Sequence, residues 1–346
     1  MEQKEMCKLF EDFGDKKVLI IGDVMIDAYV LGKVSRISPE APVPIVDVFQ
    51  RTARLGGAAN VALNIKSLGA VPVLCSVIGN DEGGFEISQL LFNEKMTTDG
   101  LMTGIDRKTT KKFRIIGNAT QMLRIDEESP HPLTSKEEKM FLVRIQEILN
   151  NEEIDVIIFQ DYDKGSITPA IIKHVTKWAQ EHHIPVVVDP KKRNFLSYRN
   201  VTLFKPNLKE MTEGLGIKVD TNDPASIQKG IKKLHDALHP QMTMVTLSEH
   251  GIAIQDGEHF AHFPAHLRNI ADVSGAGDTV ISVAALCVAC GIHPDEIAKL
   301  ANLAGGLVCE QVGVSPIDKG QLLTEAIKVE LFKKNADNAD DADFRR

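Results

Sequence analysis

The chain has 346 residues and a formal net charge of −8 at pH 7, which disfavours a broad nucleic-acid-binding surface but leaves room for a local basic pocket. Its residues are 43% hydrophobic and 25% charged, a composition that is ordinary for a soluble globular protein. No run of about 18 apolar residues occurs, so the sequence predicts no membrane-spanning helix.

The first third of the chain predicts a buried strand and two β-rich segments outside the main sheet. Residues 17–22 form a short apolar run that ends beside Asp23. Residues 31–54 contain three prolines and alternating β-branched residues without a helical period, and residues 107–126 resemble a β-hairpin. We expect these two segments to form one small sheet. Around them, the pattern predicts a helix over residues 56–68, a strand over 71–78 and a helix from about residue 84.

After residue 132, strands and helices alternate regularly. Strands are predicted over residues 155–160, 185–188, 201–204 and 242–247, and helices from about residues 135, 169, 207, 275 and 295. This alternation predicts a mostly parallel α/β sheet with helices on both faces, whose ligand site lies beyond the carboxyl ends of the strands. Polar residues follow those ends at Asp23, Asp161, Asp189, Asn207 and Ser248.

The domain organisation and the cellular compartment follow from the ends of the chain and from its cysteines. We expect one α/β domain over residues 1–334 and a disordered acidic tail over residues 335–346, because that tail is polar and lacks periodicity. The first residues lack the apolar stretch of a secretory signal, and the five cysteines are scattered and odd in number. Both features predict reduced thiols and a cytoplasmic protein.

The strongest motif runs from Asp272 to Thr279 (DVSGAGDT) and leads into an apolar helix. Small residues at a helix N-terminus expose backbone N–H groups that can bind a phosphate, and Asp278 could accept a proton from a substrate hydroxyl beside them. The alternative is a glycine-rich helix cap whose carboxylate only serves the helix dipole. Neither a P-loop motif nor a dinucleotide-binding GxGxxG occurs.

Three separated motifs resemble those of the ribokinase-like (PfkB) sugar kinase family. They are the run from Gly56 to Asn60 (GGAAN), residues 206–210 (PNLKE, an NxxE motif) and residues 272–279, and the resemblance covers about residues 15–330. It implies a ribokinase-like α/β fold with a small β-sheet lid and ATP-dependent phosphorylation of a sugar hydroxyl. A non-catalytic regulator that binds nucleotide is the rival from another class.

Four further segments are similar to the bacterial heptose 7-phosphate kinases, which phosphorylate the anomeric hydroxyl of D-glycero-D-manno-heptose 7-phosphate for ADP-heptose and lipopolysaccharide core synthesis. They are residues 35–44, 121–126, 161–165 and 189–191. Many such kinases are followed by a nucleotidyltransferase domain, whereas this sequence ends in the acidic tail, so we expect that second activity to be absent or carried by a separate chain. Ser274 replaces the threonine that is common before GAGD. A kinase for another sugar or sugar phosphate is the alternative.

The resemblance also implies a role for each matching residue. Asp278 would be the general base, and Gly275, Ala276 and Gly277 would form the anion hole. Asn207 and Glu210 would hold Mg²⁺ through water near the ATP phosphates, although Asn207 could also be only a helix N-cap. Ser248, Gly251 and Asn302 would border the nucleotide, and Asp23, Gly56, Gly57, Asn60 and Asp161 would border the sugar. A requirement for a monovalent cation is left open.

Basic residues of the β-rich segments are candidates for binding the substrate phosphate. Lys112 and Arg114 alternate along one predicted strand and so share a face. Arg124 and Lys191 are further candidates, and a solvated basic strand that protects a sheet edge is the alternative.

The predicted lid also has an apolar face, formed by Ile45, Val46 and Val48, that a single small sheet would leave exposed. Lids of this family often pair between subunits, so the resemblance implies a homodimer.

Overall fold

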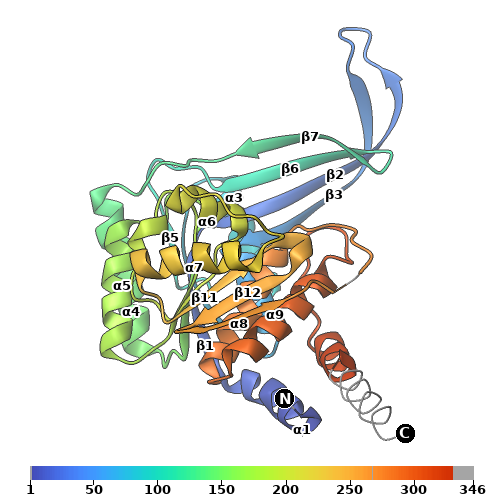
Figure 1. Ribbon diagram of the computed structural model, residues 1–346. Coiled ribbons are helices and arrows are strands. Elements are labelled where there is room, and N and C mark those ends of the chain that lie inside the picture. Colours follow the sequence, from blue (N-terminus) through green and yellow to red (C-terminus); the bar gives the residue numbers. More distant parts are fainter. Residues whose placement is uncertain (1, 267, 330–346) are drawn as a thin grey trace, which may run out of the picture.

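A computed structural model describes residues 2–266 and 268–329, so the predicted acidic tail at residues 335–346 lies outside the described residues. The described chain forms a nine-stranded sheet and a separate four-stranded sheet. In Figure 1 the smaller sheet runs across the top of the main body, and one of its hairpins extends beyond it. This arrangement confirms the predicted α/β fold with a β-sheet lid.

The main sheet has the strand order β13-β12-β11-β10-β9-β8-β1-β4-β5. Its neighbours from β11 to β5 are parallel, whereas β12 and β13 are antiparallel additions at one edge. Their bounds are β1 Lys17–Gly22, β4 Val71–Ile78, β5 Leu101–Thr103, β8 Val156–Gln160, β9 Val186–Asp189, β10 Leu203–Phe204, β11 Met242–Thr246, β12 Ile252–Asp256 and β13 His259–Phe263. The central strands β8 and β9 are buried along their whole length because helices cover both faces, and each ends in a polar residue, Gln160 or Asp189.

Alternation along the strands divides the interior into two cores. In β1, Val18 and Ile20 pack on one side of the sheet, whereas Leu19 and Ile21 pack on the other. The first core lies under α1 Gln3–Asp12, α2 Ala58–Ser67, α3 Glu82–Asn93, α8 Ala276–Ala289 and α9 Pro294–Val308. The second lies under α4 Ser135–Asn151, α5 Pro169–Glu181, α6 Leu208–Leu215 and α7 Pro224–Leu238. None of the helices in the described part of the chain combines the length and apolarity that crossing a membrane requires.

Two helices, rather than the single one expected, lie between β10 and β11. Gly216 adopts the left-handed conformation (φ 62°) and ends α6, and α7 begins eight residues later at Pro224 with Asp223 as its N-cap. A glycine at this position ends a helix without the steric penalty of a side chain. The sequence shows the glycine but not whether the helix continues through it.

The lid is a four-stranded sheet of order β3-β2-β6-β7, with bounds β2 Val24–Ile37, β3 Pro44–Gly57, β6 Thr110–Gly117 and β7 Thr120–Glu127. The strands β2 and β6 are parallel, and the other two pairs are antiparallel. The first hairpin is longer than residues 31–54, because β2 starts directly after Asp23. Its first seven residues are all buried, so they show no polar alternation that would reveal a strand. Asp23 therefore lies at the junction of the two sheets.

Candidate active site

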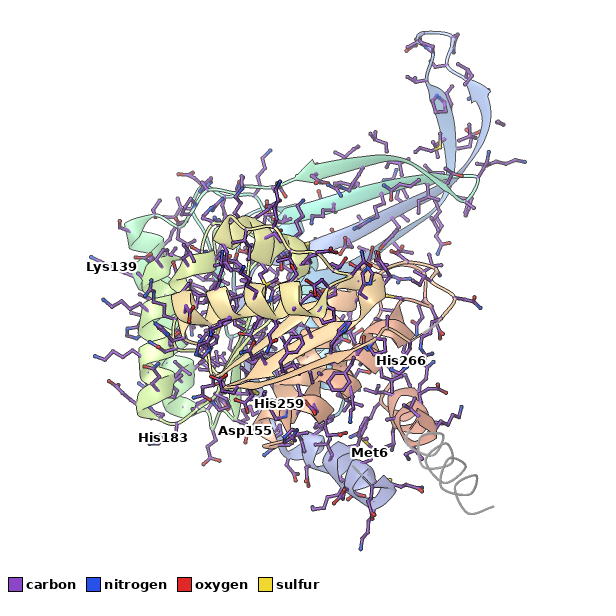
Figure 2. All side chains as sticks on the ribbon, in the orientation of Figure 1. Met6, Lys139, Asp155, His183, His259 and His266 are labelled. Atoms are coloured by element: carbon purple, nitrogen blue, oxygen red, sulfur yellow. The ribbon has the colours of Figure 1, made fainter. Side chains whose placement is uncertain are left out.

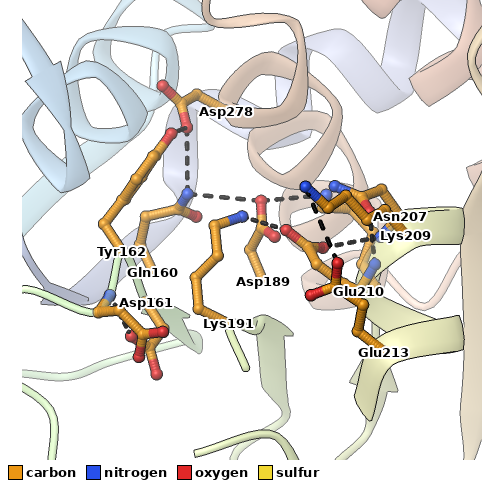
Figure 3. Close-up of polar contacts among 12 residues, drawn as sticks. Gln160, Asp161, Tyr162, Asp189, Lys191, Asn207, Lys209, Glu210, Glu213 and Asp278 are labelled. Atoms are coloured by element: carbon orange, nitrogen blue, oxygen red, sulfur yellow. Dashed lines mark hydrogen bonds and ion pairs between the residues drawn. The ribbon is translucent and has the colours of Figure 1, made fainter. Parts of the chain in front are cut away.

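Asp278 lies in the first turn of α8, beneath the junction of the two sheets, and its side chain is buried. Its carboxylate accepts three hydrogen bonds: from Asn60 Nδ2 to Oδ2 (2.7 Å), and from Gln160 Nε2 (3.0 Å) and the Tyr162 hydroxyl (2.7 Å) to Oδ1. Figure 3 shows Gln160 and Tyr162 converging on it. Burial raises the pKa of Asp278 to about 6, although the hydrogen bonds from Asn60 and Tyr162 lower it. The result is a carboxylate that is ionised at neutral pH but more basic than usual.

The turn before Asp278 leaves room for an anion. Gly275 is the N-cap of α8 and adopts the left-handed conformation (φ 83°). At Gly277, an added Cβ would meet only Asp189 Oδ2, at 3.8 Å, so the space in front of this residue is open. The first turn of a helix has backbone N–H groups without intrahelical acceptors, and the helix dipole favours negative charge there. Gly277 thus borders open space at a helix N-terminus, whereas a Cβ on Gly275 would meet Asn60 Nδ2 at 3.0 Å.

A buried ion pair lies beside this turn. Lys205 Nζ is 3.0 Å from Asp189 Oδ2, and both side chains are buried at the carboxyl ends of β10 and β9. Gln160 Nε2 donates to the same Asp189 oxygen at 3.4 Å and so connects the pair to Asp278. Lys205 therefore places a cation within the same network as the candidate base.

Asn207 and Glu210 form a reciprocal capping box at the start of α6. The Glu210 amide donates to Asn207 Oδ1, and the Asn207 amide donates to Glu210 Oε2, both at 2.8 Å. The other oxygen of Glu210 pairs with Lys191 (Figure 3). The N-cap role of Asn207 is therefore present in the structure, and the binding of Mg²⁺ through water stays a prediction. Oxygen donors of this kind fit a hard cation that keeps most of its waters.

A cavity of about 530 Å³ extends from these features to the start of β12. The predicted site residues that line it are Lys191, Asn207, Glu210, Ser248, Gly251, Ala276, Gly277 and Asn302. Gly251 cannot be replaced easily, because a Cβ there would lie 2.0 Å from the Phe263 carbonyl oxygen. Asn302 donates to the Pro264 carbonyl oxygen at 2.8 Å, which gives it a packing role as well as a place in the wall.

Asp23 binds the protein's own backbone. Its two carboxylate oxygens accept hydrogen bonds from the amides of Tyr162, Lys164 and Ser166 at 2.9, 3.0 and 2.9 Å. The side chain is buried, so it anchors the segment that carries Tyr162. A direct contact between Asp23 and a sugar stays a prediction, and the observed arrangement supports an indirect role.

Asp161 points away from Asp278. Its carboxylate accepts hydrogen bonds from Asn194 Nδ2 (3.0 Å) and the Tyr198 hydroxyl (2.8 Å) on the other side of the sheet. Burial and the charge of Asp23 raise the pKa of Asp161 to about 6. The structure therefore places Asp161 near Asp23 but does not bring it together with Asp278.

The two glycines of the first motif are packed tightly. A Cβ on Gly56 would lie 2.3 Å from Asp27 Oδ2, and one on Gly57 would lie 2.4 Å from the Asp23 carbonyl oxygen. Gly57 also adopts a positive φ of 60°. These contacts explain why the chain has no side chain at either position, whereas contact with a sugar stays a prediction.

The candidate phosphate-binding cations differ in their partners. Arg114 pairs with Asp27, and Lys191 pairs with Glu210. Arg124 pairs with Asp126 at 2.9 Å on the exposed strand β7. Among the described residues, Lys112 forms no ion pair, and its ammonium lies 5.9 Å from the centre of the Tyr162 ring. Lys112 is thus the predicted cation that is still available to a substrate.

Comparison with known proteins agrees with this geometry. The family of pfkB carbohydrate kinases matches residues 15–319. The chain belongs to this family. It is 36% identical over 324 residues to the bifunctional protein HldE of Trichlorobacter lovleyi, and 40% identical over 311 residues to that of Caulobacter vibrioides. These matches cover 93% and 90% of this chain but only 65% and 63% of the relatives' own lengths.

Solved kinases have the same fold at low sequence identity. Phosphofructokinase-2 from Escherichia coli in complex with fructose-6-phosphate has a TM-score of 0.72 at 18% identity and covers 90% of this chain and 98% of its own. Arabidopsis thaliana ribokinase complexed with ribose and ATP has a TM-score of 0.67 at 18% identity, with coverage of 89% and 98%. The prediction of a ribokinase-like fold is confirmed.

Three residues of the candidate site had no role predicted from the sequence: Gln160, Tyr162 and Lys205. Alternation could have indicated the first two, because residues two apart in an extended segment face the same side and Asp161 between them faces the other. Lys205 directly precedes Pro206 of the NxxE motif, and it is a lysine at the end of a buried strand. A buried lysine is rare unless it is paired, which makes such a position a candidate for function.

Proposed function

We propose that the chain catalyses the ATP-dependent phosphorylation of the anomeric (C1) hydroxyl of D-glycero-D-manno-heptose 7-phosphate, giving the 1,7-bisphosphate for ADP-heptose and lipopolysaccharide core synthesis. The observation that carries the reaction type is a buried, unusually basic Asp278 beside the open first turn of α8. The family and the heptose-kinase-like segments support the substrate. ATP chemistry and the five free cysteines fit a cytoplasmic location.

In the proposed reaction, Asp278 takes the proton of the C1 hydroxyl. The sugar oxygen forms a bond to the γ-phosphorus of ATP, and the bond from that phosphorus to the bridging oxygen breaks, so that ADP leaves with the electron pair. The amides of Gly277 and Asp278 and the ammonium of Lys205 would stabilise the negative charge of the transferring group. Asn207 and Glu210 would hold Mg²⁺ through water, and the metal would offset the phosphate charge.

Lys112 is the residue that we assign to the substrate phosphate. It lies on lid strand β6. Its ammonium is 5.9 Å from the centre of the Tyr162 ring, and the hydroxyl of that tyrosine donates to Asp278. Burial lowers the pKa of its ammonium, and Asp27 only partly opposes this effect. A half-buried cation without an ion pair is unfavourable, and a bound phosphate would compensate it.

A coupled ADP-release assay with MgATP tests the proposed function. The panel holds D-glycero-D-manno-heptose 7-phosphate, sedoheptulose 7-phosphate, fructose 6-phosphate, ribose and fructose. We expect kcat/KM to be at least about 100-fold higher for the aldoheptose phosphate than for any other member, since a site built for specific polar groups rejects analogues by this factor or more. Equal or higher turnover of another phosphorylated sugar would reject the heptose assignment and favour the second candidate, a sugar-phosphate kinase of the same family.

We also propose a homodimer formed through the lid. Apolar side chains of the lid are exposed, among them Phe49 at 71%, whereas Ile45 and Val46 are only partly exposed. Figure 2 shows the side chains of the β2–β3 hairpin projecting away from the rest of the molecule. Exposed apolar groups of this kind mark interaction surfaces.

Light scattering coupled to size-exclusion chromatography tests the dimer. We expect the wild type to have about twice the mass of one 38.1 kDa chain and Phe49→Asp to have the mass of one chain, because a buried charge opposes association. Phe92→Asp is the matched control, since Phe92 is 78% exposed on α3, outside the lid. A wild type with the mass of one chain, or an F49D variant that still dimerises, would contradict the proposal.

A further inference from the structure

The three donors around Asp278 are not equivalent. Asn60 and Gln160 are buried, at 0% and 1% exposed, and they approach from α2 and β8. Tyr162 is the only one of the three that lines the 530 Å³ cavity. An acceptor hydroxyl that enters from the cavity therefore meets the carboxylate on the side that the Tyr162 hydroxyl occupies. To transfer its proton, that hydroxyl needs a lone pair of Asp278. Oδ1 already accepts from Gln160 and Tyr162, so a hydroxyl that approaches Oδ1 from the cavity competes with Tyr162.

The ring of Tyr162 lies between two cations from different elements. The ammonium of Lys112, on lid strand β6, is 5.9 Å from the ring centre, and that of Lys191, after β9, is 5.4 Å from it. Such cation–π contacts stabilise the ring in place. A sugar phosphate that attracts Lys112 would weaken one of the contacts, so binding of substrate and release of the tyrosine are coupled.

We propose that Tyr162 shields the catalytic base: its hydroxyl occupies the position of the acceptor hydroxyl beside Asp278 until a phosphorylated sugar displaces it. The inference rests on the proposed role of Asp278 as the base. The shield prevents hydrolysis of ATP, in which Asp278 would take a proton from water, the water oxygen would bond to the γ-phosphorus, and ADP would leave with the electrons of the broken P–O bond. Burial and the nearby Asp278 and Asp189 raise the pKa of the Tyr162 phenol well above its ordinary value, so it stays a donor.

Tyr162→Phe tests the shield, since it keeps the ring and removes only the hydroxyl. With saturating MgATP and no sugar, we expect release of inorganic phosphate to rise about 10-fold, and the KM for the phosphorylated sugar to fall, because a competing group is gone. Tyr198→Phe is the matched control: its hydroxyl also donates to a buried carboxylate, Asp161, but away from the base. Unchanged or slower hydrolysis in Y162F would overturn the proposal.

The pH dependence of kcat/KM distinguishes the loss of the Tyr162 hydrogen bond from a general loss of packing, because only the former shifts the pKa of Asp278. The kinase needs ionised Asp278, so kcat/KM, which reports the free enzyme in which Tyr162 still bonds to Asp278, falls as the pH drops through its pKa of about 6. Tyr162 donates to the ionised form, so Y162F should move this acid limb upward by about one pH unit. Asp189, Lys191 and Lys205 also face this group and are unchanged in the variant. An acid limb that stays in place would also overturn the proposal.

The double variant Y162F/D278N separates this inference from the proposed function. The added hydrolysis of Y162F must disappear in the double variant if water reaches the base, and its persistence would overturn the shield. If the single variant D278N still phosphorylates the sugar, Asp278 is not the base, and this conclusion holds for any result with Y162F. If D278N is inactive while Y162F behaves as the wild type, only the shield is wrong. Thermal melting confirms that each variant is folded.

Discussion

The substitution Asp278→Asn is expected to lower kcat for sugar phosphorylation by roughly 10²- to 10⁴-fold, the contribution of a positioned general base. An amide cannot take the proton of the sugar hydroxyl, but it has nearly the shape of the carboxylate. One oxygen can still accept from Gln160 and Tyr162, whereas the new NH₂ group meets the Asn60 donor. The loss of that hydrogen bond costs about 1–3 kcal/mol of stability at most, which is small beside the kinetic effect.

The measurement combines steady-state kinetics with calorimetric binding of MgATP and thermal melting. Nucleotide affinity should change less than about threefold, because Asp278 acts on the acceptor hydroxyl and the residues expected to border the nucleotide, Ser248, Gly251 and Asn302, are unchanged. Asp295→Asn is the control: Asp295 is also an acid in the first turn of a helix, α9, but it lies outside the site and pairs with His259. If D278N kept more than about a tenth of wild-type kcat, Asp278 would be a cap that serves the helix dipole.

The substitution Lys112→Met should lower kcat/KM for the 7-phosphate of the heptose by roughly 100-fold. A hydrogen bond between charged groups contributes about 1.5–3 kcal/mol, and each 1.4 kcal/mol is a factor of ten. Methionine keeps most of the length of the side chain and its contact with the Tyr162 ring, so the lid strand should stay in place. Steady-state kinetics with the phosphorylated and unphosphorylated heptose measure the effect.

Two comparisons make this result specific. With the unphosphorylated heptose, K112M should change kcat/KM by less than about threefold, since no phosphate is present to lose. Lys111→Met changes the neighbouring residue, whose side chain faces the opposite side of the strand and pairs with Glu86, and it should leave the kinetics unchanged. Equal losses for both substrates in K112M would show that Lys112 supports the lid or the base instead of the phosphate.

Motifs at helix N-termini and strand ends predicted the site better than single polar residues did. Asp278, Gly277 and Asn207 were predicted from helix N-termini and strand ends, and Glu210 from the resemblance of its motif to that of the family. The structure places these four residues around one cavity or directly behind it. Strand-end carboxylates were harder to assign. Asp23 and Asp161 look equivalent to Asp189 in the sequence, yet Asp23 anchors a loop and Asp161 lies on the opposite face.

The sequence by itself determined the alternation of strands and helices, the two β-rich segments and the helix N-terminus that carries Asp278. These features are local, because the hydrophobic period and the turn residues act over a few residues at a time. Only the tertiary structure decided which polar residues meet. Asn60, Gln160, Tyr162 and Asp278 come from segments that are up to 218 residues apart, and their hydrogen bonds depend on strand register and on the packing of α8 beneath the sheet. The lack of an ion pair at Lys112 among the described residues is decided in the same way, since no local pattern tells which cations find a carboxylate and which remain for a substrate.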